Sequence, residues 1–310
     1  NCNAPDTGNM EVFMNYATKD QQDRWLKPLL SGEIRSSYAM TEPQVASSDA
    51  TNVEMSIVKE GNEWVLNGRK WFITGAMNER TRILIVMGKS DPSNPNRHLQ
   101  QTQVLVPKDT TGLTLVRPLT TFGYDDAPIG HAELVFENCR VPLENVLLGE
   151  GRGFEIAQGR LGPGRMHHCM RLIGTGQRSL ELACQRTVSR TTFGRQLSKH
   201  QSVREDISRM FSEIEMARLL VLKTCHQIDD QGVSASIDMI AATKTTVPVL
   251  MQSVIDRAIQ MHGAGGLTED YCMAEGYNYA RWCRQADGPD QVHQMALGKQ
   301  VIERYSGEKA

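Results

Sequence analysis

The tightest cluster of residues that could do chemistry is His167-His168-Cys169. Imidazole and thiolate groups are good ligands for zinc and other transition metals. The segment is expected to be helical, and adjacent side chains on a helix point about 100° apart, so they rarely share one metal ion. The sequence therefore predicts no metal site here.

Glycine-rich segments that cradle nucleotide phosphates are a second possibility. A dinucleotide-binding G-x-G-x-x-G motif must follow a strand and open a helix. Gly263-Ala264-Gly265-Gly266 follows an expected helix, and Gly162-Pro163-Gly164 lies within one. The sequence also contains no Walker A motif and no G-x-S-x-G elbow. A Rossmann domain is therefore not expected.

Asp287 is a carboxylate that directly precedes Gly288-Pro289. In one interpretation it is a turn residue, or a cap for a helix that starts near Pro289. In the other it is a catalytic base, which must be held near the proton that it removes. The residue types and their spacing leave both interpretations open.

Four longer segments stand out by their mixture of hydroxyl, aromatic, charged and small residues. They are Tyr38-Ala39-Met40-Thr41-Glu42-Pro43-Gln44-Val45-Ala46-Ser47-Ser48-Asp49, Lys70-Trp71-Phe72-Ile73-Thr74-Gly75-Ala76, Arg190-Thr191-Thr192-Phe193-Gly194-Arg195-Gln196-Leu197 with Gln201 beyond it, and the stretch from Gln260-Met261-His262-Gly263 to Ala286-Asp287-Gly288-Pro289-Asp290-Gln291-Val292-His293.

The elements that must position these segments change in type near residue 150. From about residue 53 to 148, short apolar runs broken by turn residues, with an Asn67-Gly68 turn signal, predict antiparallel strands. After Gly153 the apolar spacing becomes helical. Helices are expected over residues 154–188, 203–221, 235–262, 270–285 and 290–305, and the region before residue 35 reads as an incomplete helical segment.

Composition places the chain among ordinary globular enzymes. Its 310 residues are 40% hydrophobic and 23% charged, enough for about two domains with a large core. The net charge of −2 argues against a nucleic-acid binder. An odd number of cysteines, seven, with no C-x-x-C spacing makes a disulfide scaffold unexpected and favours a reducing compartment. No run of about 18 apolar residues predicts a membrane-spanning helix.

Taken together and in this order, the four segments resemble the acyl-CoA dehydrogenase family over essentially the whole chain. The Ala286-Asp287-Gly288-Pro289-Asp290 stretch and an extra residue in the Thr-Glu-Pro to Ser-Asp loop resemble the branch of family members 10 and 11, in which the dehydrogenase module follows a kinase-like domain. The start at Asn1, with neither a Met nor a targeting peptide, fits a piece of such a longer protein.

The resemblance implies an α+β fold of the acyl-CoA dehydrogenase type. The expected parts are a remnant of an N-terminal helical domain over residues 1–36, a middle antiparallel β-barrel or sandwich domain over residues 37–150, and a C-terminal four-helix bundle domain over residues 151–310. Most of the N-terminal helical domain, which forms one wall of the substrate pocket in the family, is expected to be missing.

The implied activity is FAD-dependent dehydrogenation of an acyl-CoA to a trans-2-enoyl-CoA. Asp287 falls where the family has its catalytic Glu, and it is one methylene shorter. Some family members carry the base directly before an Arg that matches Arg165; that position here is Gly164, which cannot be a base. The resemblance also implies substrate contacts from Ser48, Gly164, Arg165 and Gly288, with a helix salt bridge as the alternative for Arg165.

The resemblance further implies which residues contact FAD. Thr41 and Thr74 match hydroxyls that bond the flavin ring, and Phe72 matches an aromatic that covers it; the alternative for each is a side chain of the β core. Arg190 and Phe193 match a pair that reaches the FAD of a neighbouring subunit. The glycines among the remaining contacts can equally be a helix C-cap, and Pro289 replaces a family Thr. The remaining expected contacts come from Tyr38, Met40, Ser47, Ser48, Ile73, Gln201, Gln260, Gly263, Ala264, Gly265, Pro289 and Gln291.

A cofactor shared between subunits implies a homodimer or a dimer of dimers. The resemblance also implies an electron-transferring flavoprotein as electron acceptor, long or very-long acyl chains in fatty acid β-oxidation, and a mitochondrial or peroxisomal location. Two other functions stay open: an acyl-CoA oxidase on the same fold, and a non-catalytic module that binds acyl-CoA or FAD as a scaffold.

Overall fold

The computed structural model describes residues 4–309. The chain divides into two compact units, Asn1–Gly164 and Arg165–Ala310, called the first and second units below. The N-terminal helices and the β strands thus belong to one unit. The domain limits predicted after residues 36 and 150 are finer than this division and stay predictions.

The first unit begins with short helices, as the sequence predicted. These are α1 (Asp6–Tyr16), α2 (Lys19–Gln21) and α3 (Lys27–Leu30), with a π-helical turn between the last two. Thr18 opens α2 with a capping box, in which its hydroxyl accepts from the Gln21 backbone N–H and the Gln21 side chain accepts from the Thr18 N–H.

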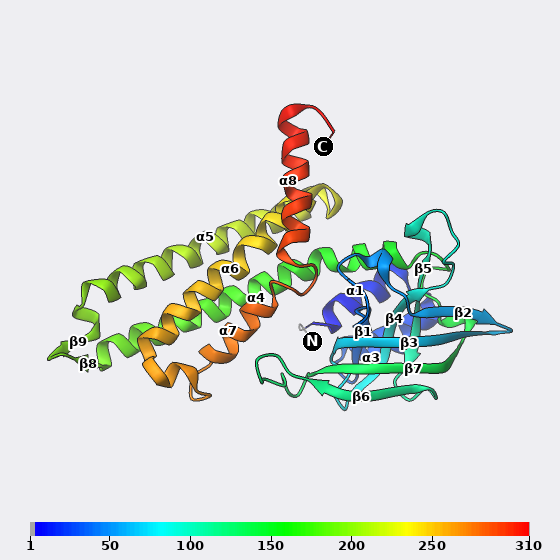
Figure 1. The fold of residues 1–310 in the computed structure, drawn as a ribbon, viewed down its shortest axis with the longest axis horizontal. Helices are drawn as coiled ribbons and strands as arrows, with labels where there is room; N and C mark the ends of the chain where they lie inside the picture. Colours follow the sequence, from blue (N-terminus) through cyan, green and yellow to red (C-terminus); the bar gives the residue numbers. More distant parts are fainter. Residues whose placement is uncertain (1–3, 310) are drawn as a thin grey trace. The chain divides into compact units, whose positions relative to one another are not determined.

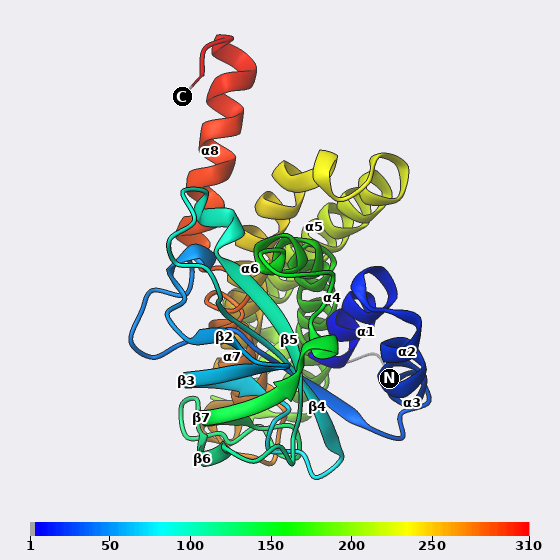
Figure 2. The ribbon, with the colours of Figure 1, turned by 90° about the vertical axis from the view of Figure 1, so that its right-hand side faces the viewer.

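The strands of the first unit form one mixed sheet (Figures 1 and 2). They are β1 (Arg35–Ala39), β2 (Ser56–Glu60), β3 (Glu63–Thr74), β4 (Thr81–Lys89), β5 (Gln101–Pro107), β6 (Leu113–Leu119) and β7 (His131–Pro142). Their order is β1-β4-β2-β3-β7-β6, and β5 also pairs with β4.

Most neighbouring strands pair antiparallel, as expected. The exceptions are β1, which runs parallel to β4, and a parallel bridge from Ser56 of β2 to Lys89 of β4. The sequence analysis missed these pairings because parallel partners are joined by long crossover connections, which leave no local turn signal.

Strand β4 is the centre of this unit because both of its faces are buried. Ile83 and Ile85 pack with residues of the N-terminal helices such as Phe13. Leu84 and Val86, on the opposite face of β4, pack with side chains of strands β3 and β7. Alternate residues of a strand point to opposite faces, so a continuous apolar run serves two cores. This explains why residues 83–87 show no polar alternation.

The second unit is helical, and the expected helices are present. Helix α4 (Gly153–Ser189) starts in the first unit and continues into the second, where α5 (Gln201–Gln231), α6 (Ile237–His262), α7 (Met273–Trp282) and α8 (Asp290–Ser306) follow. A short hairpin, β8 (Thr191–Thr192) and β9 (Arg195–Gln196), joins α4 to α5.

The core of the second unit lies where α4, α5, α6 and α7 pack side by side (Figure 1). The predicted apolar stripe of α5 points into it: Met210, Ile214, Ala217 and Val221 are fully buried. Helix α8 packs against α6, with Arg304 of its last turn paired to Asp238 of α6, and most of its apolar side chains are exposed. Within residues 4–309, no helix combines the length and apolarity needed to cross a membrane.

The central position of β4 predicts a difference between two valines of the same sheet. Val86→Ala removes a fully buried side chain and is expected to lower the free energy of unfolding by about 2 kcal/mol. Val116→Ala on edge strand β6, where the side chain is 44% exposed, is expected to change it by less than about 0.5 kcal/mol. Urea unfolding at fixed FAD concentration measures both, and equal losses would contradict the two-sided burial of β4.

Candidate active site

Asp287 lies in the turn between α7 and α8, with its backbone held in a conformation that is uncommon for a residue with a side chain. Its φ is 55°. Its backbone carbonyl accepts hydrogen bonds from Arg165 Nε and His293 Nε2, each at 3.1 Å. Such strained positions persist where the surroundings over-determine them, and they concentrate at functional sites.

Further contacts fix both sides of this turn. Lys244, fully buried, donates to the carbonyls of Cys283 at 2.5 Å and Gly288 at 3.4 Å. Arg284 Nε pairs with the buried Asp290 carboxylate at 2.7 Å. Gly288 has φ 100°, and a Cβ there would lie 2.8 Å from His293 Nε2, so only glycine fits.

The Asp287 side chain points toward α4. Its carboxylate lies 3.2 Å from His168 Nε2, and the side chain is 19% exposed. Asp287 lies in the turn before α8, whose N-cap residue is Pro289, so the turn interpretation holds. Gln291 and Pro289 follow it at the start of α8, and their cofactor contacts stay predictions.

Sequence reasoning missed His168 as a neighbour of Asp287. The cluster at residues 167–169 was considered only as a possible metal site. Within the described residues 4–309, no group of three or more His, Cys, Asp or Glu side chains is placed to hold a metal ion. Helical spacing could have found it: His168 lies three residues after Arg165, hence on the same face of α4. His293 and Lys244 carried no comparable signal.

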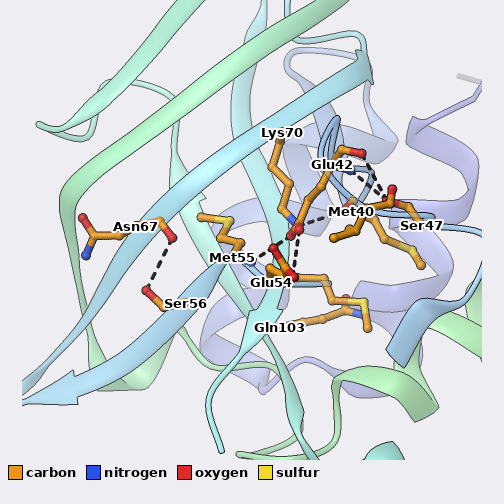
Figure 3. Close-up of polar contacts among 11 residues, drawn as sticks. Met40, Glu42, Ser47, Glu54, Met55, Ser56, Asn67, Lys70 and Gln103 are labelled. Atoms are coloured by element: carbon orange, nitrogen blue, oxygen red, sulfur yellow. Dashed lines mark hydrogen bonds and ion pairs between the residues drawn. The ribbon is translucent and has the colours of Figure 1, made fainter. Parts of the chain in front are cut away.

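In the first unit, a buried ion pair organises the loop that carries Thr41. Lys70 of β3 donates to Glu42 Oε1 at 2.8 Å and to the Met40 carbonyl at 2.7 Å (Figure 3). The Glu42 carboxylate also accepts from the backbone N–H groups of Glu54 and Met55. Burial lowers the Lys70 pKa to about 8, and Glu42 acts in the opposite direction.

Several predicted cofactor residues use their side chains for structure. Ser47 Oγ accepts from the Glu42 N–H within the loop (Figure 3), and Ile73 is buried in the β core. Tyr38 Oη accepts from Gln103, and its ring lies 4.0 Å from the Arg160 guanidinium carbon. The cofactor contacts of these residues stay predictions.

Phe72 and Thr74 are exposed enough to meet a ligand. Phe72 has φ 52° and a 41% exposed ring, beside Trp71 in an edge contact. Thr74 Oγ1 lies 3.0 Å from His131 Nδ1, and His131 Nε2 lies 3.4 Å from Asp126. Burial lowers the pKa of His131, and the Asp126 carboxylate opposes this shift.

This donor set fits the FAD that the resemblance implies. A strained, solvent-facing aromatic ring offers a stacking surface, and the adjacent Thr74 hydroxyl and backbone groups offer hydrogen bonds to ring heteroatoms. Gly263 has φ 64° and nothing within 4 Å of an added Cβ, so a ligand can approach its backbone.

The predicted contacts to a neighbouring subunit's cofactor lie on the surface of the second unit. Phe193, at the β8–β9 turn, is fully exposed, and most of its predicted companions are exposed as well. Gly263 is the C-cap of α6, which confirms the capping interpretation. Arg190 directly precedes β8, and Gln201 is the first residue of α5. Gln260, Ala264 and Gly265 lie around the end of α6.

Ser48 lines a cavity of about 370 Å³ in the first unit. The cavity is shared with Arg97, His98 and Phe154, and the last two stack their rings at 4.2 Å. Arg97 pairs with Asp49 at 3.5 Å across a largely exposed surface. Gly164 lies within α4 at the end of this unit.

The buried ion pair predicts a large loss of stability on removal of one partner. Glu42→Gln leaves the Lys70 ammonium buried without its counter-charge, and a loss of about 3–5 kcal/mol in the free energy of unfolding is expected. Glu150→Gln, which breaks the exposed pair with Lys59, is the control and should cost less than about 1 kcal/mol. Denaturant unfolding at pH 7 gives both values; similar losses would contradict a structural role for Glu42.

His293 predicts a dependence of stability on pH. Burial, helped by Arg165, lowers its pKa to about 4, below the ordinary 6.5. Between these values the unfolded chain binds more protons, so the free energy of unfolding falls as pH falls from 6.5 to 4. In His293→Gln this fall should be smaller, while the curves run parallel above pH 6.5. Urea titrations across pH 4–8 test this, and an unchanged slope would contradict it.

Comparison with known proteins agrees with the fold and with these segments. The family profile described as "Acyl-CoA dehydrogenase, middle domain" matches residues 37–139, and the profile "Acyl-CoA dehydrogenase, C-terminal domain" matches residues 151–302. The solved butyryl-CoA dehydrogenase of Megasphaera elsdenii is 26% identical with a TM-score of 0.85, covering 94% of this chain and 74% of that one.

Two sequence relatives match nearly the whole chain. Acyl-CoA dehydrogenase family member 10 of Mus musculus is 53% identical over 99% of this chain and 28% of its own length. Family member 11 of Gallus gallus is 50% identical over 96% of this chain and 39% of its own length. The chain thus spans well under half of the curated relatives that it matches. On this evidence the chain belongs to the acyl-CoA dehydrogenase family, a family of flavin-dependent oxidoreductases whose cofactor is FAD.

Proposed function

We propose that this protein is an FAD-dependent acyl-CoA dehydrogenase that converts a long or very-long acyl-CoA to the trans-2-enoyl-CoA in fatty acid β-oxidation. The observation that carries the proposal is the Asp287 carboxylate, presented from a strained turn whose backbone is held by Arg165 and His293. A base in a dehydrogenation must be held accurately, and these hydrogen bonds fix the backbone from which the carboxylate projects.

In the proposed reaction the α C–H bond breaks and its proton passes to the Asp287 carboxylate. The electron pair left on the α-carbon forms the new double bond as the β-hydrogen leaves with its electrons. FAD, when bound, supplies the acceptor for that hydride. Thr41, Phe72 and Thr74 are the residues of the first unit proposed to hold and orient it, since they combine hydroxyls with an exposed ring.

The cavity at Ser48 is proposed to take a phosphate of the coenzyme A part. A guanidinium can bind phosphate oxygens through two parallel hydrogen bonds, and Arg97 lines the same cavity as Ser48. Because Arg97 is largely exposed and only loosely paired with Asp49, it can turn toward such a ligand at small cost.

Partners and location are part of the proposal as well. The complete exposure of Phe193 supports a homodimer or dimer of dimers in which this ring meets a neighbouring subunit, since a bare aromatic side chain on a hairpin commonly marks an interface. An electron-transferring flavoprotein is the proposed acceptor of the electrons. A mitochondrial or peroxisomal location follows from the β-oxidation role.

Asp287→Asn is predicted to abolish reduction of the flavin by acyl-CoA. The amide has nearly the shape of the carboxylate but cannot accept the α-proton, so the rate constant should fall at least about 10³-fold with FAD content unchanged. Anaerobic bleaching of the oxidised flavin band, measured by stopped flow over a panel of acyl chain lengths, gives the rate.

The exposed acid Asp256 on α6 provides a matched control, and Asp256→Asn should bleach at the wild-type rate. Rapid bleaching by Asp287→Asn would show that another group is the base. Admission of oxygen after reduction separates the two acceptors, because fast reoxidation without a flavoprotein partner would favour an acyl-CoA oxidase.

A further inference from the structure

His168 is positioned between the proposed base and two half-buried polar residues, Arg171 and Tyr279. Its ring, 6% exposed, lies on α4 with Nε2 3.2 Å from Asp287 Oδ2. On its other side, Nδ1 lies 2.9 Å from Arg171 Nη2 and 3.2 Å from the Tyr279 hydroxyl. The imidazole therefore bridges Arg171 and Asp287.

The hydrogen-bond partners determine where the ring proton of His168 lies. A guanidinium only donates hydrogen bonds, so Nδ1 must accept from Arg171. In a neutral imidazole the other nitrogen then carries the proton. Nε2 therefore carries the proton, and it lies 3.2 Å from Asp287 Oδ2, within reach of that carboxylate.

Arg171 is itself held in the orientation that this tautomer needs. Its Nε donates to the Tyr279 hydroxyl at 2.9 Å. Burial raises the pKa of Tyr279, so the phenol stays protonated. The Trp282 ring packs edge-on against both His168 and Tyr279, with centroid distances of 5.6 and 4.9 Å. The group cannot rotate without breaking these contacts.

A short acidic side chain makes this contact effective. The backbone of Asp287 is already fixed through its carbonyl, so two side-chain torsions remain. A ring N–H held 3.2 Å from Oδ2 attracts the carboxylate and restricts those two torsions. The orientation of the turn itself does not depend on His168, because Arg165 and His293 already hold the Asp287 carbonyl.

We propose that His168, held as the Nε2–H tautomer by Arg171 and Tyr279, is a positioning residue that orients the Asp287 carboxylate for removal of the substrate α-proton. The proposal rests on the proposed function, in which Asp287 is the base. The C–H bond at the α-carbon breaks, its proton goes to the carboxylate, and His168 keeps its own Nε2–H throughout.

Two substitutions of His168 separate its hydrogen bond from its bulk. His168→Gln places a terminal amide N–H at about the reach of Nε2, so it can still donate to Asp287. His168→Asn keeps an amide oxygen for Arg171 but ends about one bond short of Asp287. His167→Asn, the adjacent histidine on α4, is the control because His167 has no contact with Asp287 among the interactions of the described chain.

The FAD-loaded protein and its variants are mixed anaerobically with acyl-CoA in a stopped-flow instrument. His168→Asn should slow flavin reduction by on the order of 10- to 100-fold, with substrate affinity and FAD content unchanged. His168→Gln should stay within about threefold of the wild type, and His167→Asn should equal it. Wild-type rates in His168→Asn, or equal losses in the Gln and Asn variants at normal FAD content, would overturn the proposal.

A second measurement does not depend on turnover. Long-range ¹H–¹⁵N spectra of the wild-type protein, labelled in histidine, distinguish the two neutral tautomers and the doubly protonated ring. The signal that disappears in His168→Gln should be of the Nε2–H type, and an Nδ1–H or doubly protonated signal would overturn the proposal. A wild-type protein that acyl-CoA never bleaches would instead refute the proposed function, whatever the tautomer is.

Discussion

The turn between α7 and α8 depends on one constraint: backbone carbonyls of this turn must be held by side chains from other helices. Asp287 takes a φ of 55°, which a residue with a side chain adopts only at a cost in free energy. Arg165 from α4, Lys244 from α6 and His293 from α8 each donate to a carbonyl in or beside the turn. These bonds offset the strain, and they explain why buried cationic and ring nitrogens gather around this turn.

The first unit uses the same device at the loop that carries Thr41. Lys70 is fully buried and divides its hydrogen bonds between a carboxylate and a backbone carbonyl. A buried charge pair adds little net stability compared with an apolar pair of similar size, but it allows few alternative packings. We infer that Glu42 within the Thr-Glu-Pro segment has a structural role, which leaves the neighbouring Thr41 hydroxyl for ligand contact.

Sequence reasoning succeeded where the signal was periodic or contiguous. The apolar spacing of α5 and the unbroken apolar run of β4 predicted the correct element types. A helix buried on one face has apolar residues at helical spacing, and a strand buried on both faces has a continuous apolar run. The motif around Asp287 marked the right turn but not its partners. His168, Lys244 and His293 lie on three separate helices, and nothing local in a helix reveals which residue of a distant turn it will face.

The sequence alone determined the family resemblance, the succession of helical, β and helical regions, and Asp287 as the candidate base, because each depends on residue types and short-range spacing. The tertiary structure decided that Ser47, Tyr38 and Ile73 make internal side-chain contacts, that β1 pairs parallel to β4, and that the Asp287 carboxylate lies beside His168. These are outcomes of packing between segments far apart in the chain. A hydrogen bond is satisfied by whichever partner the fold brings within about 3 Å, and only the folded chain sets that distance.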